Sequence, residues 1–400
     1  MAFTRLKIDN LFCFKDTELN LSFSRPPVNS SLEGEYIDGY EKFYFKKVCI
    51  LSGANASGKT SLGRVLFSIQ QFLDNKNLST THLSITDKSQ PAYIEADFFQ
   101  SHKGFLYRVG FLITETEKKP IIVKSTTVAG VALRKNDSCA SATKRLDKVW
   151  SEKNISMSGR TIFFSSKTLS PEDFTNACVT QDFFFGYHYA LSENEEIGNN
   201  ISRLNTSALS AVLKTFDHTI KSVAELTSKD GDGESEIQGY SIIFHNNDKV
   251  ILDLEGEITN KERLSRGTYE AVKISHLLGS VIADQKSDIG YDEKGSGIYY
   301  LDEKMAFTHT ELEKMIITLI ISKLCRYGQF FYTTHNYDVL SLDLPAHSFT
   351  FTKKQNGITS FVDATEIYKK NDRNLLAYVK NDCFGTVPDV SLIEEILFED

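Results

Sequence analysis

The stretch Gly53–Thr60 constrains this chain more than any other, because its letters GANASGKT fit the phosphate-binding pattern G-x-x-x-x-G-K-[ST]. An apolar run, Val48–Leu51, comes directly before it, and apolar residues at helical spacing follow it. The predicted order is therefore strand, glycine loop and helix. In that order the backbone N–H groups of the loop and the N-terminus of the helix face a phosphate, and the lysine supplies a positive charge. We expect the chain to bind a nucleotide.

The length of 400 residues exceeds one comfortable hydrophobic core, so two lobes or one large domain with an insertion are expected. With 41% hydrophobic residues the chain can bury a sizeable core. A net charge of −8 argues against a surface that coats nucleic acid or anionic membrane as a whole, although it is compatible with a local basic groove. The cysteines are scattered without a C-x-x-C pair, which favours reduced thiols over a disulfide framework or a zinc site.

No stretch of the sequence predicts a membrane span or a signal peptide. The first residues lack an apolar core, and no later run reaches the length that a membrane helix needs. We therefore expect a cytoplasmic protein with no membrane partner.

The pattern of apolar residues predicts the order of the main elements. Residues 3–23 alternate as two strands, and residues 92–132 read as antiparallel hairpins. Residues 204–226 have the spacing of one amphipathic helix, followed by a polar link at 228–236.

Two segments leave alternatives open. Residues 133–162 are rich in Lys and Arg, which fits either a solvated face or a contact for nucleic acid or a partner protein. The aromatic runs at 162–164 and 183–189 could stack on bases, but we favour a core role because no joint interleaving of glycine with arginine accompanies them.

Three later segments complete a phosphoryl-transfer site. Leu264–Thr268 opens a helix with a serine and a glycine that can donate to a phosphate. Ile298–Glu303 is an apolar strand that ends in two carboxylates, where one acid can hold Mg²⁺ and the next can orient and deprotonate water. A further apolar strand ends at His335.

These four motifs, in this order, resemble the ABC-type ATPase heads shared by SMC proteins, the RecF repair ATPase and the OLD-like bacterial defence ATPases. The resemblance runs from residue 3 to about residue 385. It implies an α/β fold, a P-loop ABC-type ATPase head with an N-terminal antiparallel β subdomain and an inserted α-rich lobe. The implied domains are an N-terminal ATPase lobe at 1–132, the inserted lobe at 133–235 and a C-terminal ATPase lobe at 236–400. Phe12 stands where these heads have an arginine.

Two further matches narrow the resemblance. Thr308-His309 is similar to a Leu-His pair, and the tail 376–389 to a closing segment, of the short stand-alone ATPases in phage-defence operons. That group includes the ATPase subunits of the PARIS and Septu systems and the abortive-infection ATPases, which act in a toxin–antitoxin-like manner.

The resemblance implies a homodimer that sandwiches ATP, with higher oligomers left open. It implies that Thr60 and Asp302 order Mg²⁺, that Glu303 is the general base and that His335 reads the γ-phosphate. Gln100 and Gln181 are the candidates for the glutamine of the Q-loop. The ATP-binding residues it implies are Gly53, Asn55, Ala56, Ser57, Gly58, Lys59, Thr60 and Ser61 of one chain, with Leu264, Ser265, Arg266, Gly267 and Thr268 of the other.

The expected function is that of a slow, Mg²⁺-dependent ATP hydrolase that acts as a sensor or regulatory switch. Residues 336–400 carry no cluster of metal-spaced carboxylates, so a nuclease of the Toprim or HNH type would be a separate effector protein. A phage protein or DNA would be the trigger. The docking surfaces expected for the effector are the inserted lobe, about 130–235, and Ser391–Asp400, whose apolar stripe could instead pack on its own head.

The rival interpretation is a DNA-binding repair or loading ATPase of the RecF or SMC kind. It predicts salt-dependent binding of duplex DNA through Lys144, Arg145 and Lys148. A transporter subunit is disfavoured, because its signature would read Leu-Ser-Gly-Gly-Gln.

Overall fold

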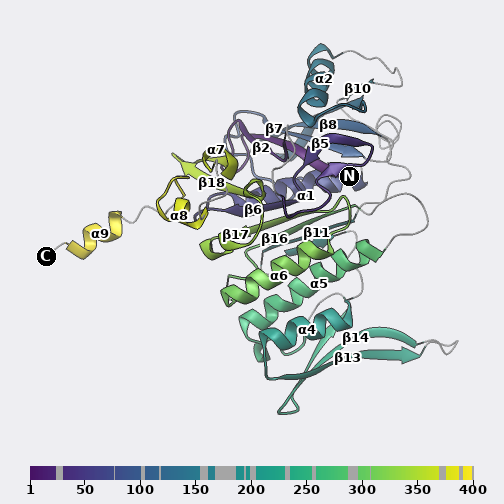
Figure 1. Ribbon diagram of the computed structural model, residues 1–400, viewed down its shortest axis with the longest axis vertical. Helices are drawn as coiled ribbons and strands as arrows, with labels where there is room; N and C mark the ends of the chain where they lie inside the picture. The colour runs from purple at the N-terminus through teal and green to yellow at the C-terminus, as the bar shows by residue number, and fades with distance from the viewer. Residues whose placement is uncertain are drawn as a thin grey trace. The chain divides into compact units, whose positions relative to one another are not determined.

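The computed structural model describes residues 1–23, 30–75, 77–100, 104–116, 119–153, 161–166, 186–192, 195–198, 204–229, 235–254, 258–286, 296–306, 308–368, 375–386 and 391–398. The chain divides into two compact units. Unit 1 combines Met1–Phe183 with Tyr332–Asp400, and unit 2 is Phe184–Phe331. The elements of both are labelled in Figure 1. Among the described residues, no helix has the length and apolar character needed to cross a bilayer.

The largest sheet of unit 1 is antiparallel, with strand order β10-β9-β8-β7-β1-β2. Consecutive strands lie side by side in most of it, and alternate residues of β1 such as Leu6 and Ile8 are fully buried. The hairpins predicted over 3–23 and 92–132 are thereby confirmed. The strands are β1 (Ala2–Asp9), β2 (Thr17–Asn20), β7 (Ala92–Gln100), β8 (Phe105–Thr116), β9 (Lys119–Ala132) and β10 (Thr161–Ser166).

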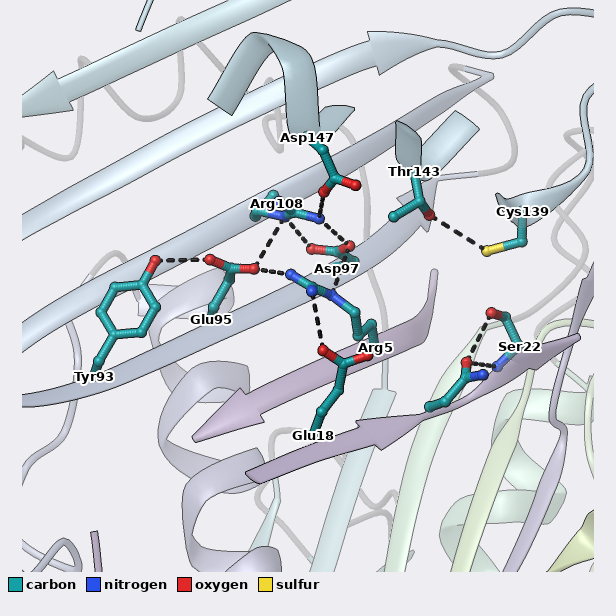
Figure 2. A network of polar contacts seen from close by, with 11 residues as sticks. Arg5, Glu18, Ser22, Tyr93, Glu95, Asp97, Arg108, Cys139, Thr143 and Asp147 are labelled. Atoms are coloured by element: carbon teal, nitrogen blue, oxygen red, sulfur yellow. Dashed lines mark hydrogen bonds and ion pairs between the residues drawn. The ribbon is translucent and has the colours of Figure 1, made fainter. Parts of the chain in front are cut away.

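Helix α2 (Cys139–Glu152) packs against this sheet through a buried charge network, drawn in Figure 2. Arg108 donates to both oxygens of Asp97, at 2.6 and 2.8 Å, and pairs with Asp147 of the helix at 2.8 Å. The strand residue Arg5 contacts Asp97 and Glu95 from the other side. Buried charges are tolerated only when they are paired, so this network fixes both the register of the strands and the position of the helix on the sheet.

The phosphate loop of unit 1 follows a short, wholly buried strand, β6 (Val48–Ser52). This strand runs parallel to β18 (Phe349–Gln355), which returns antiparallel as β19 (Ile358–Asp363) through an Asn356-Gly357 turn with positive φ at both residues. Helix α1 (Lys59–Asn75) begins at the loop. The predicted order of strand, loop and helix is confirmed.

The remaining elements of unit 1 are short. A small sheet has the order β3-β5-β4. Phe384, after α8, stacks on Phe351 of β18 with ring centroids 3.9 Å apart, which holds the C-terminal segment against the strand. These elements are β3 (Ser22–Phe23), β4 (Tyr36–Ile37), β5 (Tyr40–Phe45), η2 (Tyr337–Ser341), η3 (Ala346–Ser348), α7 (Ala364–Ile367), α8 (Leu375–Lys380) and α9 (Ser391–Phe398). Strand β17 (Gln329–Thr334) carries the chain from unit 2 into unit 1.

Unit 2 is a layer of helices on strands that are parallel in one pair and antiparallel in another. Strand β11 (Gly186–Ser192) pairs parallel with β16 (Gly297–Asp302) and antiparallel with β12 (Glu195–Gly198). Helix α5 (Arg266–Lys286) packs on β11 and β16 and also contacts α6 (Thr310–Lys323), as Figure 1 shows. A separate antiparallel sheet has the order β13-β14-β15. Its strands are β13 (Ile220–Lys229), β14 (Ser235–Phe244) and β15 (Lys249–Asp253), and η1 (Lys261–Arg263) precedes α5.

The amphipathic helix expected over 204–226 is wrong in its second half. Helix α4 covers Thr206–Phe216 only, and Ile220 already belongs to β13. Asp217 ends the helix because its carboxylate accepts hydrogen bonds from the N–H and hydroxyl of Thr219, which turns the chain. Apolar residues spaced by three fit a helix and a twisted strand about equally over so short a stretch.

The mixed α/β class is confirmed. The described residues of 133–235 contain strands β10 to β13 as well as helices α2 and α4, so that segment is less helical than expected. The domain boundaries predicted at 132/133 and 235/236 were placed from sequence motifs, whereas the two units are defined by how compactly the chain packs. The predicted lobes therefore stay predictions. The core role favoured for the aromatic runs is confirmed for Phe163, Tyr187 and Tyr189, which are at most 5% exposed.

Candidate functional site

The phosphate loop lies between β6 and α1, and two of its residues have backbone conformations that open a concave turn. Ala56 has φ +58° and Gly58 has φ +94°. Lys59 is 4% exposed, and its amine donates to the carbonyls of Gly53 and Ala54, at 2.9 and 3.0 Å. Backbone N–H groups in such a turn form an anion-binding concavity. The loop is therefore preformed, and the Lys59 side chain lies against its backbone.

The loop is braced by the β18–β19 hairpin. Ser57 shares a hydrogen bond with Thr352, 2.6 Å between hydroxyl oxygens, and its carbonyl accepts from the Thr359 hydroxyl at 3.0 Å. Lys354 donates to the carbonyl of Ala56 at 2.9 Å. Two of these contacts engage loop carbonyls, those of Ala56 and Ser57, so the hairpin fixes the backbone of the loop.

Glycine is required at both ends of the loop. A Cβ at Gly53 would approach the backbone carbonyl oxygen of Thr352 to 2.6 Å, and a Cβ at Gly58 would approach the sulfur of Cys13 to 2.6 Å. Cys13 belongs to the turn that includes Phe12, whose φ is +53°. This turn thus packs directly on the phosphate loop.

His335 also lies in unit 1, at the end of β17, where its side chain is exposed. The hydroxyl of Thr334 accepts from the N–H of Asn336 at 2.9 Å, and the Asn336 side chain caps η2. The histidine is therefore presented at a turn whose backbone is fixed on both sides.

The signature segment lies in unit 2 and starts α5 as predicted. The hydroxyl of Ser265 accepts from the N–H of Thr268 at 3.1 Å and lies 2.7 Å from the Thr268 hydroxyl. Thr268 is buried, whereas Ser265 and Arg266 are exposed. Leu264 is buried and anchors the segment from the other side. The helix start is thus exposed, and Gly267 leaves it without a side chain at its second residue.

The two carboxylates at the end of β16 differ in environment. Asp302 is 6% exposed, and Glu303 follows it with φ +50°, a conformation that bulky residues rarely adopt. The next residue, Lys304, is buried and pairs with Glu270 of α5 at 3.6 Å. Burial lowers the pKa of the Lys304 amine, against the opposing effect of the Glu270 and Asp302 carboxylates.

The structure thus places the predicted residues in two groups. Unit 1 holds the phosphate loop and His335, and unit 2 holds the signature segment and Asp302-Glu303. Gln100 ends β7, is buried, and its side-chain oxygen has no hydrogen-bond partner among the described residues. Gln181 lies outside the described residues. The choice between these two glutamines stays open.

A cluster in unit 2 was not predicted from sequence. The Glu196 carboxylate lies 2.7 Å from a ring nitrogen of His188, 3.1 Å from one of His276 and 2.8 Å from the Lys273 amine. Burial alone would raise the pKa of the Glu196 carboxyl, but the hydrogen bonds from the two histidines outweigh it and hold that pKa well below its ordinary value. The sequence held one signal for this cluster. Polar residues recur at 270, 273, 276 and 280, on a helix whose buried face is otherwise apolar.

Three other predicted features have clear positions. Arg145 of the basic stretch is held by Asp137, at 2.7 and 2.6 Å, and by the carbonyl of Ala132, so it serves the fold. His309 caps α6 by accepting from the N–H of Glu311. Helix α9 exposes Ile393, Ile396 and Leu397 by 63, 70 and 73%. Residues 387–390 of the tail lie outside the described residues.

No protein-family model matches the chain. No curated protein matches it. Among solved structures, the chain is similar to one described as "Crystal structure of the SmcHead bound to the C-winged helix domain of ScpA". The identity is 12%, the match covers 90% of this chain and 98% of that chain, and the TM-score is 0.44. At this identity no residue role is transferred.

Proposed function

We propose that this protein is an ATPase of the ABC type that binds and hydrolyses ATP with Mg²⁺. The observation that carries the proposal is the preformed phosphate loop, with positive φ at Ala56 and Gly58 and a buried lysine at its mouth. The motifs of unit 2 add a helix start that can donate to phosphate and a strand that ends in two acids.

Each residue has a role that follows from its chemistry. The loop N–H groups and Lys59 bind β- and γ-phosphate oxygens, and the lysine exchanges its two carbonyl contacts for phosphate when it does so. Glu303 accepts a proton from the attacking water, and His335 donates to the γ-phosphate. Ser265 and Gly267 act on the nucleotide of a second copy of the chain, so hydrolysis requires a dimer.

Thr60 and Asp302 are the residues that would hold Mg²⁺, which supplies charge neutralisation at the β- and γ-phosphates. A hydroxyl and a single carboxylate fit this ion, because Mg²⁺ retains several waters and takes further ligands from the phosphates. The described residues contain no group of three or more His, Cys, Asp or Glu side chains arranged for a metal. The proposed site therefore depends on the nucleotide.

We infer further that ATP engagement regulates a separate effector, a nuclease of the Toprim or HNH type, in anti-phage defence. This finer proposal rests on the sequence resemblance at Thr308-His309 and at the C-terminal segment. The exposed apolar side chains of α9 support it, because they give a partner protein an accessible surface. Co-purification from the native operon followed by mass spectrometry tests it, and the absence of any nuclease would refute it.

The test of the ATPase proposal is nucleotide binding and hydrolysis by purified protein, compared with the variant Lys59→Ala. We expect the variant to lose binding of a fluorescent ATP analogue. The substitution removes the positive charge of Lys59, whose amine contacts the loop carbonyls of Gly53 and Ala54. Lys88→Ala is the matched control, since Lys88 forms an exposed pair with Glu115. Equal nucleotide affinity in the two variants would refute the proposed site.

The rival DNA-binding function is weakened by the position of Arg145, which is committed to Asp137. Lys144 and Lys148 remain exposed on α2. Duplex binding at low salt that Lys144→Gln with Lys148→Gln abolishes would favour the rival. Absence of binding by the unaltered protein would exclude it.

A further inference from the structure

Helix α5 buries a line of polar side chains on the face that it turns toward β11 and β16, where apolar residues would be expected. Apolar neighbours such as Ala271 and Ile274 occupy the rest of the same buried surface. The polar members of the line are Glu270, Lys273, His276, Ser280 and Asp284, each at most 8% exposed. A line of this kind costs stability unless every charge is paired.

Each charged residue of the line has a partner. Lys273 pairs with Glu196 of β12 at 2.8 Å, and Asp284 accepts from the Tyr299 hydroxyl of β16. Glu270 pairs with Lys304 at 3.6 Å. The contacts therefore lie in the first half of the helix and near its C-terminal end. A slide or rotation of α5 by one residue would break them, whereas apolar packing alone would tolerate a small shift.

The pair at the N-terminal end differs from the others in what it joins. Lys304 directly follows Glu303, the proposed general base, and the positive φ of Glu303 turns the chain before the lysine side chain enters the interior. Both side chains of the pair are nearly excluded from solvent, at 4% for Lys304 and 6% for Glu270. Glu270 lies about one helical turn from the signature residue Gly267. The pair thus connects the turn that carries the base with the first turns of the signature helix.

We propose that Lys304 and Glu270 are positioning residues that hold the Glu303 turn and the signature end of α5 in one fixed relation. The inference rests on the proposed ATPase function and deepens it. Neither residue contacts the reacting atoms. The pair acts because a buried ion pair has one favourable geometry, so any movement of the Glu303 turn is passed to the helix start and the reverse. The base and the signature therefore take up their working positions together.

The decisive variant replaces both charges by apolar residues, Lys304→Met with Glu270→Leu. Exchange of a whole buried ion pair for apolar side chains is often neutral for stability, so this protein should fold. We expect its nucleotide affinity to match that of the unaltered protein, since the phosphate loop is untouched. We expect its kcat to fall by about tenfold, the effect of losing a pair interaction of ordinary strength.

Two single variants separate positioning from simple loss of stability. Lys304→Met and Lys273→Met each leave one buried glutamate without its lysine, so both should lower thermal stability. Only Lys304→Met should lower kcat about tenfold at unchanged nucleotide affinity. The conservative Lys304→Arg should recover most of the kcat, because it restores the charge.

The outcomes distinguish this inference from the proposed function. If the unaltered protein neither binds nor hydrolyses ATP, the proposed function fails. If it hydrolyses ATP and the apolar double variant keeps full kcat, the positioning role is overturned. Equal losses of kcat in Lys304→Met and Lys273→Met would also overturn it, because they would show that only the stability of α5 matters.

Discussion

Arg108 is expected to carry much of the stability of unit 1, and its replacement by methionine is a quantitative test. Its guanidinium makes a two-point contact with Asp97, which is completely buried, and a third contact with Asp147. Removing one partner of a buried pair costs about 3–5 kcal/mol, because the other charge stays buried and uncompensated. Asp97 keeps Arg5 at 3.2 Å, which favours the lower end of that range.

Two further losses bring the expected cost to about 4 kcal/mol. The contact with Asp147 adds little, because that carboxylate is 52% exposed and screened by water. The guanidinium also lies 5.5 Å from the ring centre of Trp150, and such a cation–π contact is worth about 0.5–1 kcal/mol. With the denaturant dependence of a protein of this size, the unfolding midpoint should fall by about 1–2 M urea.

The single tryptophan of the chain makes the assay specific. Trp150 lies beside Arg108 and edge-on to Phe163, so its fluorescence reports the unfolding of this part of unit 1. Lys88→Met is the control, since its ion pair is exposed and should matter by less than about 1 kcal/mol. A midpoint for Arg108→Met no lower than that of the control would refute the reasoning.

A double variant tests the cause. Asp97→Leu with Arg108→Met removes both charges and should be more stable than Arg108→Met alone, because the buried Asp97 carboxylate no longer remains without the guanidinium. Additive losses in the double variant would mean that lost packing, not an unpaired charge, explains the effect.

Three other predictions concern the candidate site and unit 2. Gly53→Ala should abolish nucleotide binding in a fluorescence titration while the fold is retained by circular dichroism, because the added Cβ would meet the Thr352 carbonyl oxygen at 2.6 Å; binding of normal affinity would contradict the close approach. Glu303→Gln should lower ATP hydrolysis by about 100-fold or more and accumulate an ATP-bound dimer by size-exclusion chromatography, and an unchanged rate would remove Glu303 from the base role. The pKa of the Glu196 carboxyl is lower in the folded than in the unfolded protein. The stabilisation that this carboxylate gives the folded state is therefore complete above about pH 4.3 and declines as the pH falls toward the folded pKa. Hydrogen exchange of α5 should therefore differ between the unaltered protein and Glu196→Gln at pH 6, and the difference should begin to shrink as the pH is lowered from 4 to 3; a difference that does not shrink would contradict this assignment.

Several parts of the fold could be predicted because they depend on neighbouring residues. The apolar run before Gly53, the glycines of the loop and the helical spacing after it specify β6, the loop and α1 without reference to the rest of the chain. The hairpins β7 to β9 followed from alternation in the same way. The helix predicted over 204–226 was wrong after residue 216, where the apolar spacing fits a helix and a strand alike. The turn at Asp217 ends the helix there.

The partners of polar residues could not be predicted in this way. Lys354 reaches the carbonyl of Ala56, and Glu196 meets His276, across long stretches of sequence. Arg145 lies in a basic stretch whose composition fits a nucleic-acid contact, yet its guanidinium binds Asp137 and a strand carbonyl.

The sequence by itself therefore determined the order of elements, the phosphate loop and the acids that end β16, because backbone conformation and the spacing of apolar residues are local properties. Only the tertiary structure decided which charges are buried and what each one contacts. The physical reason is that an ion pair such as Lys304 with Glu270 forms where packing brings two elements together and removes water, and neither condition can be read from the residues beside it.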